Sequence, residues 1–111
     1  MIRHYIIERN YWKNYFDFIS KDMRAQQVEL EVVGLDLGDQ IEEEWVSFEG
    51  ISYDTKKNIL FVHTATIKHT ILEPLEIVVE DEDSMLRSIA VKDRLSHLQL
   101  IKLRSPLQIG E

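Results

Sequence analysis

The hydrophobic pattern of the chain changes its period once, near residue 25. Over residues 10–24 the large apolar side chains recur at offsets of three and four, which predicts an amphipathic helix. Asn10 is the expected N-cap, because its side-chain oxygen can accept a hydrogen bond from the first unpaired amides. We expect the apolar stripe to be a packing face, made by Trp12, Tyr15, Phe16, Ile19 and Met23.

From residue 27 onward apolar and polar residues alternate, which predicts half-buried antiparallel strands. The segment 45–53 changes phase at Gly50, and a glycine at a phase change indicates a bulge or a sharp bend. Pro74 belongs at an edge or a corner, because it cannot donate to a strand ladder. The predicted strands begin at Val28 and cover 28–32, 45–53, 59–66, 69–72, 75–79, 85–91 and 97–103.

One helix followed by five to seven short strands indicates an α+β fold. We expect an N-terminal helix and then a strongly bent antiparallel sheet or a small, partly open barrel, with the helix over one opening. Such curling would protect the exposed sheet edges. The length of 111 residues predicts a single domain, 1–111.

The composition argues against several kinds of protein. The chain has no cysteine, which excludes a disulfide scaffold, a thiolate zinc site and a cysteine nucleophile. The net charge of −7 argues against a nucleic-acid partner, since clustered Lys and Arg supply most of the affinity for phosphates. No stretch approaches the roughly 18 apolar residues of a membrane span, and the N-terminus has no signal-peptide pattern. We therefore expect a cytoplasmic protein with no membrane partner.

Two histidines six residues apart are the main candidates for chemistry. On one continuous strand, His63 and His69 would lie about 20 Å apart, too far to share a metal ion. If residues 65–68 form a hairpin turn, the two rings could meet, with His97 or a carboxylate as the third ligand of an open zinc site. The alternative is a pair of half-exposed histidines bonded to threonine or backbone groups. The sequence leaves both open.

Other catalytic motifs are missing. The acidic runs Glu42–Glu44 and Glu80–Asp83 lack the glycine and the alternating ligands of a calcium loop, so we expect solvated turns there. The sequence holds no nucleophile elbow and no glycine-rich phosphate loop. No cofactor is expected, and an enzyme would have to depend on the histidines alone.

Three aromatic residues, Trp45, Phe48 and Tyr53, are candidates for an interaction surface. Trp45 alternates with Val46, so one of the two faces outward unless a bulge lets both pack inside. An exposed tryptophan beside Phe48 or Tyr53 would be a typical hot spot. An exposed strand edge would also suit β-augmentation by a peptide or by another copy of the chain.

The order of several segments resembles a family of small, mainly bacterial, uncharacterised proteins, a domain of unknown function. The resemblance implies no activity, because none is assigned to that family. It runs from the aromatic helix to the end of the last strand and is carried by Trp12–Ser20, 28–34 with Leu37-Gly38, 48–54, 69–71 with Pro74, and 103–106.

The architecture also distantly resembles an Sm-like barrel, in which a helix precedes strongly bent strands. The segment 50–54 before a hydrophobic strand carries this likeness. Of the RNA-binding residues of Sm proteins, Asn58 is a loose match for the asparagine, and the late Arg-Gly pair has no counterpart. The RNA function is therefore not carried over.

The function that the sequence favours is a non-catalytic protein-interaction or structural module that associates with itself or with an unknown protein partner. The alternative is a metal-assisted enzyme that uses His63, His69 and His97. An Sm-like nucleic-acid binder is the third reading.

Overall fold

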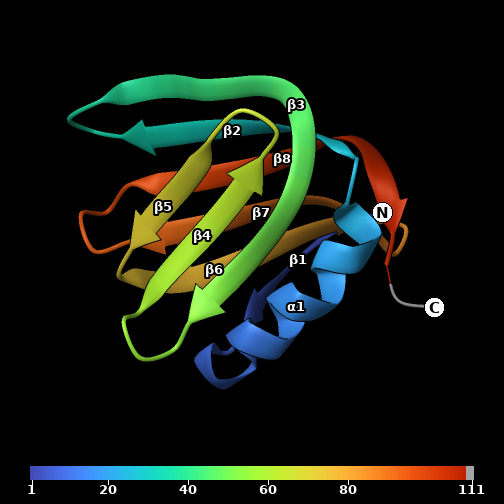
Figure 1. The fold of residues 1–111 in the computed structure, drawn as a ribbon, viewed down its shortest axis with the longest axis horizontal. Helices are drawn as coiled ribbons and strands as arrows, with labels where there is room; N and C mark the ends of the chain where they lie inside the picture. The colour runs from blue at the N-terminus through green and yellow to red at the C-terminus, as the bar shows by residue number, and fades with distance from the viewer. Residues whose placement is uncertain (110–111) are drawn as a thin grey trace.

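The chain forms one antiparallel sheet of eight strands with a single α-helix within residues 1–109, the part that the computed structural model describes (Figure 1). Helix α1 covers Trp12–Met23 and follows a 3-10 turn, Arg9–Tyr11. The strands are β1 Ile2–Ile7, β2 Gln27–Gly34, β3 Gly38–Asp54, β4 Ile59–Thr64, β5 Lys68–Leu72, β6 Pro74–Glu82, β7 Met85–Asp93 and β8 Leu98–Gln108.

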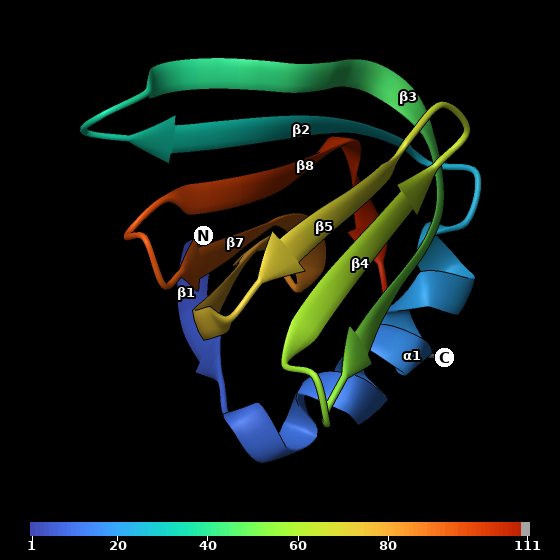
Figure 2. The same ribbon diagram turned by 60° about the vertical axis from the view of Figure 1, so that its left-hand side comes forward.

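Strand β3 belongs to two layers of the sheet. The strands follow the order β1-β6-β7-β8-β2-β3-β4-β5. Residues 38–47 of β3 pair with β2, and residues 48–54 pair with β4. The strand bends between these two parts, so β4 and β5 lie over the larger layer made by β1, β6, β7, β8 and β2 (Figure 2). A bulge between Phe48 and Gly50 marks the bend and confirms the predicted irregularity at this glycine.

The two layers and the helix share one core. The buried face of α1 is made by Trp12, Phe16, Ile19 and Met23, as the helical spacing predicts. These side chains pack in a cluster with apolar residues of the sheet, among them Val28, Leu30, Phe48, Ile51, Leu60, Val62, Ile77, Ile89 and Ile101. Burial on this scale is the main force that holds the helix to the sheet.

One serine attaches α1 to the second half of β3. The Ser20 hydroxyl donates to the Ile51 carbonyl at 2.8 Å and accepts from the Ile51 amide at 3.0 Å. Ile51 follows the bulge and is 3% exposed. Ser20 therefore satisfies the amide and the carbonyl of Ile51, which water reaches poorly. These groups lie on the side of β3 where α1 packs and no further strand is present.

The predicted fold class is wrong in two respects. The sheet has eight strands, not five to seven, and its end strands β1 and β5 do not pair, so it is an open sheet rather than a partly closed barrel. The helix is short and follows a strand. Strand β1 escaped detection because five of its six residues are exposed, so it shows no alternation of buried and exposed positions.

Two further expectations need correction. Asn10 is not the N-cap, because it lies in the 3-10 turn and Tyr11 occupies the cap position without a side-chain hydrogen bond. Neither acidic run is simply a solvated turn: Glu42–Glu44 lies inside strand β3, since the β2–β3 hairpin extends to Gly34 and Gly38, and residues 80–82 are the end of strand β6, with Asp81 buried. In the described part of the chain no helix is long and apolar enough to cross a membrane.

Replacing Ser20 by alanine is expected to destabilise the protein by about 1–3 kcal/mol, because both Ile51 backbone groups lose their partner. The measurement is the free energy of unfolding in urea. Ser52→Ala, at an exposed position of the same strand, is the control and should change stability by less than about 0.5 kcal/mol. Equal losses in the two variants would contradict the anchoring role of Ser20.

Candidate functional site

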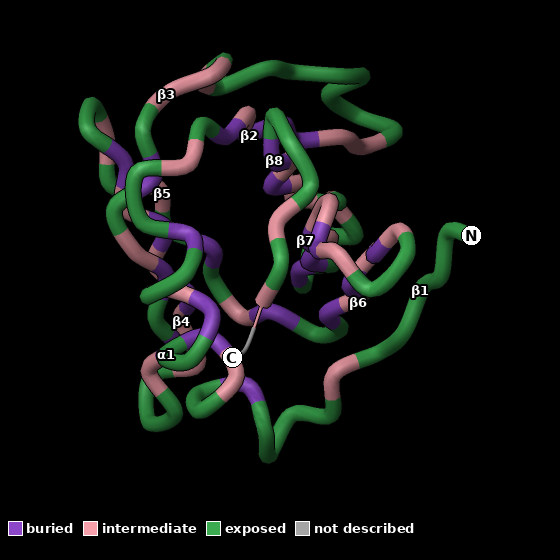
Figure 3. Tube along the Cα trace, turned by 90° about the vertical axis from the view of Figure 1, so that its right-hand side faces the viewer, coloured by how far each residue is buried: buried purple, intermediate pink, exposed green. Residues whose placement is uncertain are grey.

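The larger layer has one face that no other element of the described chain covers. Along β6, β7 and β8, alternate side chains are fully buried against the smaller layer and α1, for example Ile77, Ile89 and Ile101. The side chains between them point the other way. We call this second surface the open face; Figure 3 shows the resulting change between buried and less buried positions along these strands.

A row of apolar side chains crosses the open face at right angles to the strands. Ile6, Val78, Ala90 and Leu100 are direct partners on β1, β6, β7 and β8, so they share one face. On β7 the next residue of this face is Ser88. Alanine and serine are small, and the face is hollowed above them.

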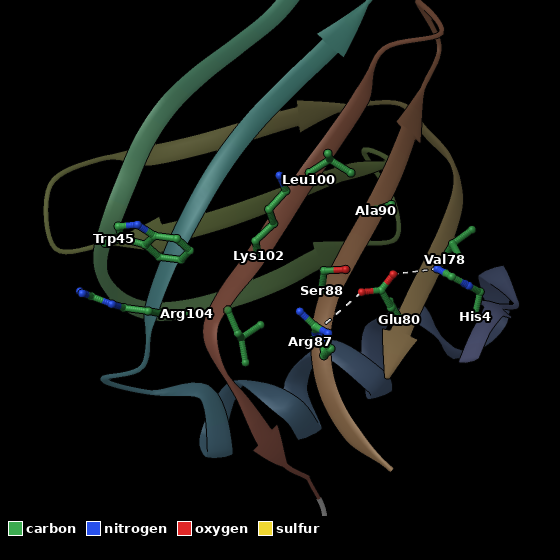
Figure 4. Close-up of a pocket in the computed structure, with 11 residues that line it drawn as sticks. His4, Trp45, Val78, Glu80, Arg87, Ser88, Ala90, Leu100, Lys102 and Arg104 are labelled. Atoms are coloured by element: carbon green, nitrogen blue, oxygen red, sulfur yellow. Dashed lines mark hydrogen bonds and ion pairs between the residues drawn. The ribbon is translucent and has the colours of Figure 1, made fainter. Parts of the chain in front are cut away.

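The resulting hollow has a volume of about 560 Å³. Figure 4 shows its lining side chains rising from β1, β6, β7 and β8 on one side and from the bend of β3 on the other. Trp45 and Arg104 stand at the β3 side, and the Arg104 guanidinium lies 5.8 Å from the centre of the indole ring. A hollow with an aromatic wall and mixed polar groups is the usual form of a binding site.

The charged side chains around the hollow largely neutralise one another. Arg87 and Lys102 each have a carboxylate partner on a neighbouring strand, and the His4 ring is hydrogen-bonded to Glu80, so no field of one sign develops. Arg104 donates to the neutral Gln27 side chain at 2.6 Å. The three pairs are His4–Glu80 at 2.8 Å, Arg87–Glu82 at 2.5 Å and Lys102–Glu31 at 2.5 Å.

Trp45 is half-buried and has an unusual backbone conformation. Its φ of 51° lies in the left-handed region, which a bulky residue enters only at a cost. It sits where β3 has one extra residue opposite β2, between the pairs Val28–Val46 and Leu30–Glu43. Val46 packs against the core while the Trp45 ring lines the open face, as the ordinary alternation of neighbouring strand residues predicts.

Two carboxyl groups beside the hollow share a hydrogen bond. The bond with Asp39 and the ammonium group of Lys102 lower the pKa of Glu31, which is 6% exposed. The same bond with Glu31 raises the pKa of Asp39. The Lys102 pKa is raised by its hydrogen bond to Glu31. Glu31 is thus the ionised partner, and Asp39 retains a proton more readily than an isolated aspartate.

The structure does not bring the predicted histidine pair together. Residues 64–67 do form a turn between β4 and β5, but His63 pairs with Lys68 and His69 pairs with Val62. Because directly paired residues share a face, the two rings lie on opposite faces of the sheet. His63 lies beside Phe61, whose ring centre is 6.4 Å from that of the imidazole.

His69 and His97 are joined only through other side chains. The His69 ring nitrogen Nε2 lies 2.8 Å from the side-chain oxygen of Gln99 on β8. The Gln99 side-chain nitrogen in turn donates to the Asp93 carboxylate at 3.0 Å. The same Asp93 carboxylate accepts from the backbone amide of His97 at 3.0 Å and lies 3.9 Å from the imidazole. These bonds fix the β7–β8 hairpin and link it to β5.

The far side of His97 contacts the β2–β3 hairpin. Its ring nitrogen lies 2.8 Å from Asp36, a bond that lowers the pKa of that carboxyl. Gly34 leaves room for this contact, because a Cβ atom there would meet the His97 ring at 2.5 Å. Residues 1–109 include no group of three His, Cys, Asp or Glu side chains placed to hold a metal ion.

The three aromatic candidates have different surroundings. Trp45 lines the hollow, whereas Phe48 and Tyr53 are 1% and 6% exposed and belong to the core. The Tyr53 hydroxyl donates to Asn58 at 2.7 Å and accepts from Arg9 at 3.1 Å. Of the predicted interaction residues, Trp45 is the one that the fold leaves available to a partner.

Residues 3–111 match the family model described as "Family of unknown function (DUF5335)". The chain belongs to this family. It is also 35% identical over 106 residues to an uncharacterised protein of Aquifex aeolicus (strain VF5), an alignment that covers 95% of this chain and 96% of the relative. No solved structure matches the chain significantly. The predicted family resemblance is confirmed; the Sm-like architecture is not.

Sequence reasoning did not find the other residues of the hollow. Ser88, Ala90, Glu80 and Lys102 come from three strands, and only their register brings them together. A signal was present in part, since small residues in the middle of strand 85–91 indicate a place where the sheet surface dips.

Replacing Asp39 by asparagine is expected to stabilise the protein at neutral pH. A raised carboxyl pKa means that the folded state favours the protonated form of Asp39. The stability that protonated Asp39 contributes is therefore lost as the pH rises through the raised pKa. Asparagine keeps a neutral donor for Glu31 at every pH. The gain in Tm at pH 7 should therefore shrink as the pH falls through the raised pKa of Asp39 towards the ordinary aspartate value of about 4.

Asp36→Asn provides the control of opposite sign on the same hairpin. The Asp36 pKa is lowered, so its contribution is present above the ordinary pKa and is lost as pH falls through the lowered value. This variant should lower Tm at pH 7 and approach the wild type in acid. The same sign for both substitutions would refute the assignment of the two carboxyl groups.

Trp45→Gly is expected to be more stable than Trp45→Ala by about 1 kcal/mol, because only glycine enters the left-handed region without cost. Urea unfolding of both variants measures the difference. At the exposed neighbour Glu44, whose φ is not positive, the order should reverse, with Glu44→Gly less stable than Glu44→Ala by about 0.5–1 kcal/mol. If Trp45→Gly were instead less stable than Trp45→Ala, as expected at Glu44, the backbone at Trp45 would not be strained.

Proposed function

We propose that this protein is a non-catalytic interaction module that receives a protein partner on the open face of its sheet. The observation that carries the proposal is the hollow itself: an apolar row across four strands, small residues at its centre and a half-buried tryptophan at its wall. An uncovered surface of this kind is typical of binding faces rather than of an ordinary solvated sheet.

The charge pattern favours a protein over a polyanion. Of the basic groups around the hollow, Arg87 and Lys102 are ion-paired with carboxylates, so a phosphate chain would have to displace internal ion pairs to use any cation besides Arg104. A partner with an apolar ridge and a polar rim could instead fill the hollow and leave these pairs in place. Trp45 and Arg104 are the residue types that most often supply binding energy at protein interfaces.

A catalytic role has less support. The titratable groups at the hollow form ion pairs with each other, and they do not converge on one point with a nucleophile and a base. The hydrogen-bonded chain through His69, Gln99, Asp93 and His97 ties strands together. We therefore assign a structural role to His69 and His97.

The proposal can be tested by site-specific photo-crosslinking in the source organism. A crosslinker is placed at Leu100 on the open face and, as a control, at Leu72 on β5, which is 59% exposed. A protein captured from Leu100 and not from Leu72 is then purified, and its Kd for the unmodified chain is measured by calorimetry.

Two variants then decide whether the hollow is the binding site. Ala90→Arg fills it and Trp45→Ala removes its aromatic wall; each should weaken binding by about tenfold to a hundredfold, the range of interface hot spots. Ser52→Arg, at an exposed residue outside the hollow, should not change the Kd. Unchanged affinity in both hollow variants, with folding intact by circular dichroism, would overturn the proposal.

A further inference from the structure

The two edges of the sheet differ in how well they are protected. Strand β5 is short, begins with Lys68 and is tied to β8 through His69. Strand β1 pairs with β6 over its full length without a bulge, and its other side is free within the described chain. It has no lysine or proline, and its one permanent charge, Arg3, is paired with Asp81 of the same chain, so little on this strand blocks the edge. Figure 3 shows β1 exposed along nearly its whole length.

The exposed side chains of this edge are largely apolar. Ile2 is 51% exposed, Tyr5 40% and Ile6 61%. A free, flat and apolar edge strand readily adds a strand from another chain.

We infer that β1 is the surface on which two copies of this chain pair, strand against strand, about a two-fold axis. A strand that pairs with its own copy across a two-fold axis must run antiparallel to it. Directly opposed residues share a face, so even-numbered residues oppose even-numbered ones. Two registers pair five of the six residues of β1, one centred on His4 and one on Tyr5. The register centred on His4 places Ile2 opposite Ile6 and Arg3 opposite Tyr5, whereas the other would place the charged Arg3 opposite Ile7.

The register centred on His4 is chemically complementary to itself. The Ile2–Ile6 pairs are apolar, and the Arg3 guanidinium can lie against the Tyr5 ring of the second copy. Like charges do not collide at the axis, because Arg3 is held by Asp81 of its own chain at 2.9 Å and His4 by Glu80 at 2.8 Å. In a chain of net charge −7, β1 contains no acidic residue, so this edge is where two copies repel each other least.

A groove beside the strand supplies further apolar area. It has a volume of about 700 Å³, lies between β1 and α1, and is lined by Ile6, Ile7, Tyr11, Tyr15 and Phe18 among others. Tyr11 and Phe18 are 60% and 52% exposed. Stable dimers bury roughly 1,200–2,000 Å² in total, more than one strand pair offers, and antiparallel pairing brings the start of the second β1 beside this groove.

The pairing would leave the open faces unobstructed. A two-fold axis perpendicular to the joined sheet keeps equivalent faces on the same side, so the two hollows would face one direction. The dimer therefore neither requires nor blocks the partner proposed above, and each can be tested alone.

Light scattering coupled to size exclusion tests the pairing on the full chain. The expected mass is about twice 13.1 kDa at micromolar concentration. Ile6→Lys places a charge on the free edge and should give a monomer, whereas Leu72→Lys, at a residue of equal exposure on the opposite edge, should stay dimeric. A monomeric wild type, a dimeric Ile6→Lys or a monomeric Leu72→Lys would each overturn the inference.

The absence of cysteine allows a direct test of the register. Residues on the axis lie about 4.5–5.5 Å apart at Cα, within the range that a disulfide spans. His4→Cys should form a disulfide-linked dimer under mild oxidation, and Thr70→Cys at the centre of β5 should not. Pairing centred on His4 would be refuted if the His4→Cys chain stayed unlinked or if both variants were linked equally. Linking of Thr70→Cys alone would also refute it and would indicate β5 as the paired edge.

Discussion

The structure depends on one strand serving two layers. Strand β3 leaves the larger layer and enters the smaller one without a break in the chain, and it can do so because bulges lie on both sides of its bend. The bend brings β4 and β5 over the inner face of the larger layer and gives α1 a strand side on which to dock. Without it, the apolar side chains of the inner face would have no second surface to pack against.

The same bend creates the candidate site. Val46 packs inward and Trp45, its neighbour, lines the opposite face, while the bulge beside them gives Trp45 its left-handed backbone at the bend. The strained backbone of Trp45 is thus a cost of turning the strand, and the core compensates for it. A tryptophan held in this way loses little further freedom when a partner covers it, which suits an interface anchor.

Alternation and helical spacing predicted the helix face and seven of the eight strands, because those elements each bury one side. Strand β1 was missed for the converse reason, since it buries neither side. The number of strands and the openness of the sheet depend on which edges meet, and this is a property of long-range pairing that a local pattern does not contain.

The site was less predictable than the fold because it depends on register. The hairpin turn between His63 and His69 was one of two alternatives that the sequence left open, and the register that follows it sends the two rings to opposite faces. The hollow arises in the same way, from Ala90 meeting Val78 and Leu100 across three strands.

Edge and face make different demands on a partner. An edge offers backbone groups that any extended strand can satisfy, so selectivity must come from side chains, and those of β1 complement a second β1. A face offers no free backbone groups, so its selectivity depends on its shape. The hollow at Ser88 and Ala90 gives the open face a distinct shape. Because β1 contributes His4 and Ile6 to the open face as well as its own free edge, pairing at the edge would also hold in place the strand that borders the hollow. The dimer would thus steady the border of the hollow without being needed for partner binding, because the hollow is complete within one chain.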